Sequence, residues 1–174
     1  TRNGGFGLGI RAHLDTVATL AEGCASTAWC AGVIQAHSWM LSHFPVEAQD
    51  EVYGADPDAV VSAVIGPRGK ATKTDDGYVL SGFWPFASGN ENSEWLLLGA
   101  VVHDADGNPI DEGDFLVATN AVTRHDDWFV NGLTATGSCS MCLTTASSSK
   151  EGSSRPSVSS RSRCSRCPAS RVRR

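Results

Sequence analysis

The chain has 174 residues, enough for one ordinary domain or two small ones, and its hydrophobic fraction of 41% allows a packed core. Its net charge of -5 hides a division, because residues 1–138 carry 6 basic and 18 acidic side chains while residues 139–174 carry 8 and 1. The acidic part argues against a nucleic-acid partner, and the lack of any apolar run of about 18 residues argues against a membrane-spanning helix.

The N-terminus lacks the basic segment and apolar run of a signal peptide, so we expect a cytoplasmic protein with Cys24 and Cys30 reduced. Thr1 stands where a starting Met is expected, which suggests an internal position in a longer protein.

Residues 10–41 are rich in Ala, Leu and other good helix formers, with apolar residues at helical spacing, and predict helix. Gly23 interrupts this stretch, and Ser26 is placed to cap a second helix. Pro45 suits the start of a short third helix over residues 46–53, where its missing N–H costs little.

The hydrophobic period changes to two after residue 58, and turn residues bound each apolar run. The Asp75-Asp76-Gly77 sequence is a strong hairpin signal, and residues 104–108 predict a second turn. Helices followed by antiparallel strands indicate an α+β fold. Strands are predicted at residues 60–65, 70–73, 78–82, 95–103, 115–119 and 123–128.

Several segments resemble one family in their order along the chain. They are Ser26-Thr27-Ala28-Trp29, His37-Ser38-Trp39, Pro67 with Gly69, Gly77 to Gly82, Trp84-Pro85-Phe86-Ala87-Ser88-Gly89, and Gly132 to Ser138. Together they resemble the acyl-CoA dehydrogenase superfamily. The segment from Trp84 to Gly89 is similar to that of the flavin-dependent phenol hydroxylases, the oxygenase components of two-component systems.

Acyl-CoA dehydrogenases usually carry Thr-Glu-Pro-x-Ala-Gly-Ser-Asp and Trp-Ile-Thr-Asn-Gly at these places, which favours the hydroxylase branch here. The resemblance implies a partial helical N-terminal domain (residues 1–55) and an antiparallel β-barrel middle domain (residues 56–138). It further implies a tetramer for the intact protein and a C-terminal helical domain that covers the flavin. We expect the chain as given to lack that domain and therefore to have little activity.

The resemblance implies an oxygenase that takes reduced FMN or FAD from an NAD(P)H-dependent flavin reductase and uses O2 to hydroxylate an aromatic, phenolic substrate. A dehydrogenating or desulfurising flavoenzyme of the acyl-CoA dehydrogenase type is the alternative within the fold. The sequence leaves open both the substrate and the choice between FMN and FAD.

The resemblance also places the flavin ring, against aromatic and aliphatic walls that exclude water. Ser88 is expected to hydrogen-bond flavin or substrate, the alternative being a turn-capping Ser before Gly89. The expected cofactor-binding residues are Trp29, Ala63, Val64, Ile65, Trp84, Phe86, Ala87 and Ser88.

His37 is the candidate acid–base residue, because histidine titrates in the range needed to hold or remove a phenol proton. By resemblance a His at this point of the helix borders the phenol pocket. The alternative is a surface His on an amphipathic helix, which we expect for His43.

Residues 139–174 contain two Cys-x-x-Cys pairs separated by 21 residues, a spacing close to that of a four-Cys zinc site. A zinc-binding interaction module through Cys139, Cys142, Cys164 and Cys167 is therefore a further alternative. With 12 Ser and 7 Arg among 36 residues, however, we predict a disordered tail without metal. The same composition is typical of a GC-rich gene read out of frame, and we predict a frame slip near Ser138 to Ser140.

Overall fold

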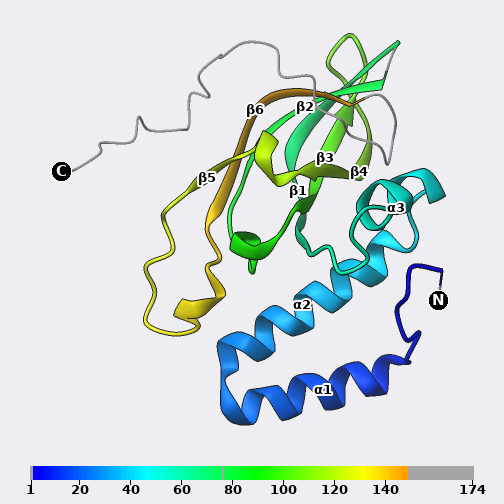
Figure 1. The fold of residues 1–174 in the computed structure, drawn as a ribbon. Helices are drawn as coiled ribbons and strands as arrows, with labels where there is room; N and C mark the ends of the chain where they lie inside the picture. Colours follow the sequence, from blue (N-terminus) through cyan, green and yellow to red (C-terminus); the bar gives the residue numbers. More distant parts are fainter. Residues whose placement is uncertain (1, 76, 149–174) are drawn as a thin grey trace.

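The computed structural model describes residues 2–75 and 77–148, in which three α-helices stand against one six-stranded sheet (Figure 1). This arrangement confirms the predicted α+β class. The helices are α1 (Ile10–Gly23), α2 (Ala25–Leu41) and α3 (Val46–Tyr53). The strands are β1 (Val61–Thr74), β2 (Gly77–Trp84), β3 (Trp95–His103), β4 (Pro109–Ala118), β5 (Thr123–His125) and β6 (Ser140–Ser148). Short 3-10 helices are η1 (Asn90–Asn92), η2 (Thr119–Ala121) and η3 (Thr134–Thr136).

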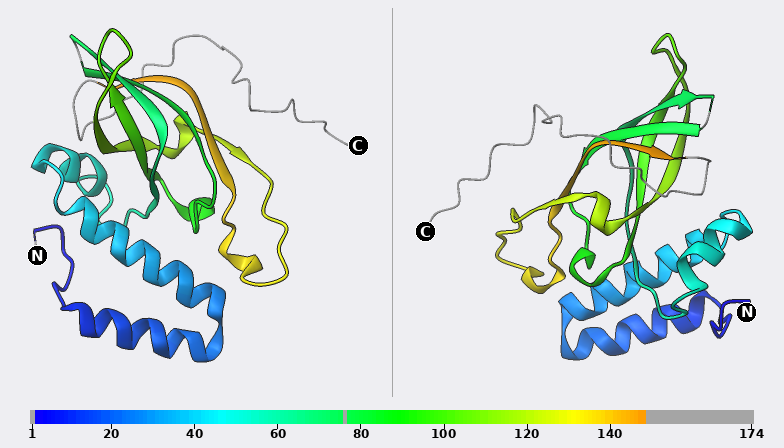
Figure 2. Two further views of the ribbon diagram at one scale, coloured as in Figure 1. Left: turned by 180° about the vertical axis from the view of Figure 1, so that it is seen from behind. Right: turned by 45° about the horizontal axis from the view of Figure 1, so that its top comes forward.

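The helices α1 and α2 form an antiparallel pair, and α2 lies between α1 and the sheet (Figures 1 and 2). The break between them falls at Gly23 as predicted, but Ser26 is not the cap. Cys24 takes the extended N-cap conformation, with φ of -156°, and Ser26 is a buried residue inside α2. Pro45 directly precedes α3, where it leaves no helical hydrogen bond unmade.

The strand order in the sheet is β4-β3-β1-β2-β6-β5. The predicted hairpin is confirmed, since β1 and β2 pair antiparallel up to Thr74 and Gly77. The predicted antiparallel barrel is wrong in two respects. Strands β1 and β3 are parallel, and within the described residues β4 and β5 are the open edges of the sheet. The chain that follows β2 returns to the end of the sheet where β1 starts before it enters β3, so β3 runs parallel to β1.

β1 is one long strand where the sequence predicted two, and its register against β3 shifts between Val64 and Gly69. The irregularity brings the backbone close to Gly99 of β3, where an added Cβ would meet the Gly66 carbonyl oxygen at 2.8 Å. Gly66 and Pro67 therefore mark a bulge that the strand passes through, not its end.

Strand β3 is buried on both faces, as its continuous apolar run predicts. On one face Leu96 and Leu98 join a core cluster around Trp84. On the other, Leu97 packs in a second cluster with Leu41 of α2 and Val52 of α3. The sheet is thereby fixed against the helices at the end where α2 meets β1.

The predicted disorder of the tail is wrong for its first ten residues. Ser140–Ser148 form β6, which pairs antiparallel with β2 and with β5. Cys139 and Cys142 are buried there, whereas Cys164, Cys167 and the rest of residues 149–174 lie outside the described residues. In the part that the structure describes, no three His, Cys, Asp or Glu side chains gather as a metal site. No helix in the same part is long and apolar enough to cross a membrane.

Candidate functional site

Two loops and one helix meet at the end of the sheet. The crossover segment (residues 85–94) joins β2 to β3, and the β5–β6 loop (residues 126–139) runs beside it toward α2 (Figure 1). Two backbone hydrogen bonds tie the loops together, from Ala87 N–H to the Cys139 carbonyl at 3.1 Å and from Gly89 N–H to the Thr136 carbonyl at 2.9 Å. The loops therefore form one surface.

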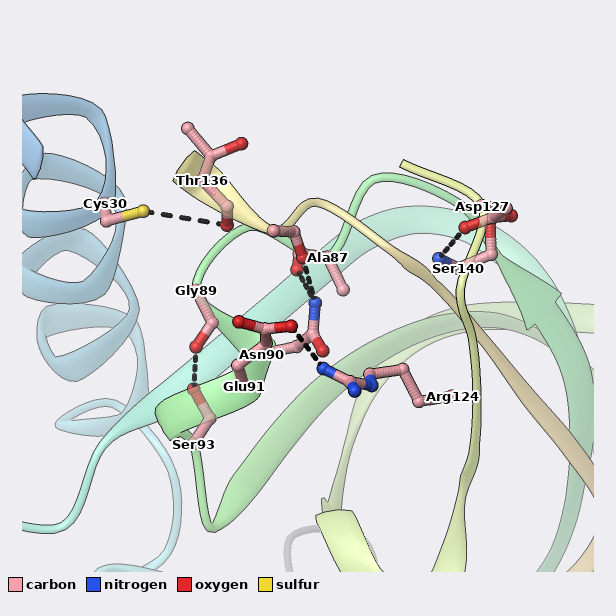
Figure 3. Close-up of polar contacts among 11 residues, drawn as sticks. Cys30, Ala87, Gly89, Asn90, Glu91, Ser93, Arg124, Asp127, Thr136 and Ser140 are labelled. Carbon is pink, nitrogen blue, oxygen red and sulfur yellow. Dashed lines mark hydrogen bonds and ion pairs between the residues drawn. The ribbon is translucent and has the colours of Figure 1, made fainter. Parts of the chain in front are cut away.

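Asn90 clamps the same two loops through its side chain (Figure 3). It is 2% exposed, and its amide nitrogen donates to the carbonyls of Ala87 and Gly137, both at 2.5 Å. Next to it, Glu91 of the crossover segment pairs with Arg124 of β5 at 2.6 Å. These side-chain contacts fix the crossover segment against the β5–β6 loop and β5, although the segments are far apart in the sequence.

Ser88 is the centre of this surface. Its hydroxyl accepts a hydrogen bond from the Trp29 indole N–H of α2 at 3.0 Å and contacts the Ser138 hydroxyl at 2.8 Å. Its carbonyl accepts from the Ser62 hydroxyl of β1 at 2.8 Å. Ser88 therefore joins α2, β1 and both loops, which is more than a local turn cap requires.

Exposed aromatic side chains flank Ser88. Trp29 is 49% exposed and Phe86 is 66% exposed, although both carry large apolar rings. Phe86 has a φ of +69°, a conformation that costs a side chain roughly 1–2 kcal/mol. Its ring meets the Trp128 ring edge-on, with centroids 6.0 Å apart. Strain that presents an apolar ring to the outside is typical of a ligand-binding site.

His37 lies two turns further along α2, half-buried against β1. Its Nδ1 is 3.1 Å from the Val61 carbonyl oxygen, and since a carbonyl only accepts, Nδ1 must carry the hydrogen. This fixes Nε2 as the nitrogen that can take up a proton. Burial lowers the pKa of His37 below its usual value of 6.5, and the Val61 hydrogen bond offsets part of that effect. The lowered pKa favours the neutral form of the His37 ring at neutral pH.

The lowered pKa of His37 predicts a pH-dependent stability. The unfolded chain binds the proton more readily than the folded one, so the free energy of unfolding should fall as the pH drops below about 6.5 and stop falling below the folded-state pKa. The variant His37→Asn should lack this contribution. Urea unfolding across this pH range measures both proteins, and parallel pH profiles would show that the His37 site does not disfavour the charged ring.

The remaining predicted site residues divide into two groups. Ile65 is 56% exposed, and Ala63 and Val64 are half-buried in β1. The side chains of Trp84 and Ala87 are fully buried, so they support the surface from behind.

Sequence reasoning missed three hydroxyl residues of the site, Ser62, Thr136 and Ser138, each 4% exposed or less. The Thr136-Gly137-Ser138 sequence had carried the family resemblance, but nothing in it indicated contact with Ser88.

Comparisons with known proteins agree on the kind of protein. No family model matches the chain. Over 119 residues it is 38% identical to HsaA, the oxygenase subunit of a flavin-dependent monooxygenase of Mycobacterium tuberculosis, covering 68% of this chain and 30% of that protein. Over 125 residues it is 42% identical to the oxygenase component of the FADH2-dependent resorcinol hydroxylase of a Rhizobium species, covering 71% and 30%.

A solved structure gives the same result. XiaF from a Streptomyces species, in complex with FADH2 and glycerol, matches with a TM-score of 0.79 and 34% identity, over 82% of this chain and 36% of that one. The chain thus spans about a third of the length of the proteins it matches. By sequence and by fold, it belongs to the oxygenase components of flavin-dependent monooxygenases, with an acyl-CoA dehydrogenase fold.

Proposed function

We propose that this protein is the oxygenase component of a two-component monooxygenase that uses reduced FMN or FAD and O2 to hydroxylate a phenolic substrate. The observation that carries the proposal is the surface formed by Trp29, Phe86 and Ser88, with His37 two turns further along α2 and bonded to Val61 of β1. It combines exposed rings, a buried hydroxyl and a neutral base, the elements that such a reaction asks of the protein.

The residues present fit a flavin. The exposed rings of Trp29 and Phe86 and the side chain of Ile65 offer apolar area for a flat ring system. Ser88 offers a polar group next to the Trp29 indole, which donates to it. When bound, reduced flavin supplies the electrons that activate O2. The surrounding apolar side chains then keep water from the reacting atoms.

In this proposal His37 holds or removes the phenol proton. The Val61 carbonyl keeps the Nδ1 hydrogen in place, so the free lone pair stays on Nε2. A phenol placed near Nε2 becomes a better nucleophile as its proton is withdrawn. Ser88 and Trp29, which are hydrogen-bonded to each other, then orient the ligand.

The partners belong to the same proposal. A separate flavin reductase must supply the reduced flavin, and its NAD(P)H comes from the cytoplasm, so we place the protein there. We also propose a tetramer for the intact protein. The exposure of α1 supports this proposal, because it leaves apolar side chains available to contact another subunit. Helix α1 has no buried residues, and its Ile10 and Leu14 are 73% and 58% exposed.

Flavin binding tests the site. In the full-length protein, Phe86→Ala should weaken binding of reduced FMN or FAD by roughly 10- to 100-fold, because the ring would lose about 1.5–3 kcal/mol of apolar contact. Anaerobic titration measures the dissociation constants.

Phe6→Ala is the matched control, since Phe6 is 93% exposed in the segment before α1. Equal effects of the two substitutions would exclude the surface at Phe86 as the flavin site. No saturable binding of either flavin by the wild type, or reduction of bound flavin by an acyl-CoA, would contradict the proposed function itself.

A further inference from the structure

Three buried hydroxyl groups form a hydrogen-bonded row that begins at Ser88. Ser88, Ser138 and Thr136 are 8%, 4% and 2% exposed. The Ser88 and Ser138 oxygens are 2.8 Å apart, the Ser138 and Thr136 oxygens 2.6 Å, and the Thr136 oxygen is 2.9 Å from the Leu133 carbonyl oxygen. We call this row the hydroxyl relay.

The two ends of the hydroxyl relay determine the direction of every hydrogen bond in it. The Leu133 carbonyl only accepts, so Thr136 donates its one hydrogen there. Ser138 must then donate to Thr136, and Ser88 must donate to Ser138. At the other end the Trp29 indole has no acceptor and donates to Ser88.

We infer that Ser138 and Thr136 are positioning residues that restrict the Ser88 hydroxyl to accepting hydrogen bonds from a ligand. A hydroxyl has one hydrogen and two acceptor sites. The hydrogen of Ser88 is given to Ser138 and one acceptor site is taken by Trp29, which leaves one acceptor site for a ligand.

This inference rests on the proposed function and gives it a specific consequence. Reduction of a flavin turns its N5 from an acceptor into an N–H donor. With N5 at the free acceptor site of Ser88, a hydroxyl that can only accept would favour the reduced ring and would offer nothing to the oxidised one. The relay would therefore make the site select the redox state of its cofactor, through the buried residues Ser138 and Thr136.

The test compares three variants of the full-length protein. Ser138→Ala frees the Ser88 hydrogen to point at a ligand, and Ser138→Thr restores an acceptor for it. Ser93→Ala is the matched control, because Ser93 is a buried serine in the crossover segment whose hydroxyl donates to the Gly89 carbonyl at 2.9 Å, outside the relay (Figure 3).

The first readout needs no ligand. The indole N–H resonance of Trp29 should shift in Ser138→Ala, because Ser88 is the Trp29 acceptor and its polarisation changes when it loses Ser138. Ser138→Thr should return the resonance toward its wild-type position, and Ser93→Ala should leave it in place. A Trp29 resonance unmoved by Ser138→Ala, or moved as far by Ser93→Ala, would overturn the relay.

The second readout is the ratio of dissociation constants for oxidised and reduced flavin. Ser138→Ala should lower this ratio by about three- to tenfold, the size of one hydrogen bond, and a tenfold change equals about 30 mV in a two-electron midpoint potential. An unchanged ratio would overturn the inferred selection while leaving flavin binding intact. If the wild type binds no flavin, the proposed function is refuted. The Trp29 resonance would still decide whether the hydroxyl relay exists.

Discussion

Replacement of His37 by asparagine should lower the turnover of phenol hydroxylation by roughly 10²-fold or more, the usual contribution of a general base. An asparagine amide can still donate to the Val61 carbonyl, as Nδ1 does, but it offers no group that takes up a proton. Steady-state hydroxylation by the full-length protein, with reduced flavin supplied, measures the loss. Added imidazole should restore part of the rate in His37→Ala.

His43→Asn is the matched control. His43 lies just beyond the end of α2, is exposed as predicted, and bonds the Trp39 carbonyl at 2.9 Å. It shares with His37 the pairing of Nδ1 with a carbonyl but stands outside the site. The same loss in His43→Asn, or a His37→Asn enzyme as fast as the wild type, would refute the assignment of His37 as the base.

Replacement of Trp84 by alanine should lower the free energy of unfolding by about 3–5 kcal/mol, a large part of the 5–15 kcal/mol typical of a domain. Trp84 is fully buried, and its indole N–H donates to the Gly99 carbonyl at 2.7 Å. The ring fills a slot left by two glycines, and a Cβ added at Gly82 would lie 2.7 Å from it. Urea unfolding followed by circular dichroism measures the change.

Two further variants separate packing from loss of an aromatic residue. Trp39→Ala removes a tryptophan that is 66% exposed and should cost under about 1 kcal/mol. Gly69→Ala would place a Cβ against the Trp84 ring, so its cost should be smaller in the Trp84→Ala background. Strict additivity of the two substitutions would mean that the ring does not fill the slot at Gly69.

The elements that depend on local signals could be predicted from the sequence. Gly23 marked the break between α1 and α2, Pro45 marked the start of α3, and Asp75 with Gly77 marked the hairpin between β1 and β2. Each signal is a backbone preference of the residues themselves, so it needs no knowledge of distant contacts.

The elements that depend on distant contacts could not be predicted in the same way. The parallel pairing of β1 with β3 follows from where the crossover segment returns, and nothing local sets that path. The strand β6 has a Ser-rich sequence typical of disorder, yet it gains hydrogen bonds from β2 and β5 that composition does not reveal.

The site shows the same division. Trp29, His37, Phe86 and Ser88 could be proposed from residue type together with the resemblance. Ser138 could not be assigned a role, because it becomes informative only when the fold brings it to 2.8 Å from Ser88. Trp84 was proposed as a cofactor-binding residue through the resemblance of the segment from Trp84 to Gly89, and nothing in the sequence indicated that its side chain would be fully buried.

The hydrogen bonds of Ser88 also bear on the order in which the protein folds. Its partners are 26, 50 and 59 residues away in the chain, at Ser62, Ser138 and Trp29. Contacts between such distant residues carry a high entropic cost of loop closure and generally form late. The surface around Ser88 is therefore completed only when α2, β1 and both loops have docked. Any ligand that binds there binds only the folded chain, so it should stabilise the whole fold and raise its melting temperature.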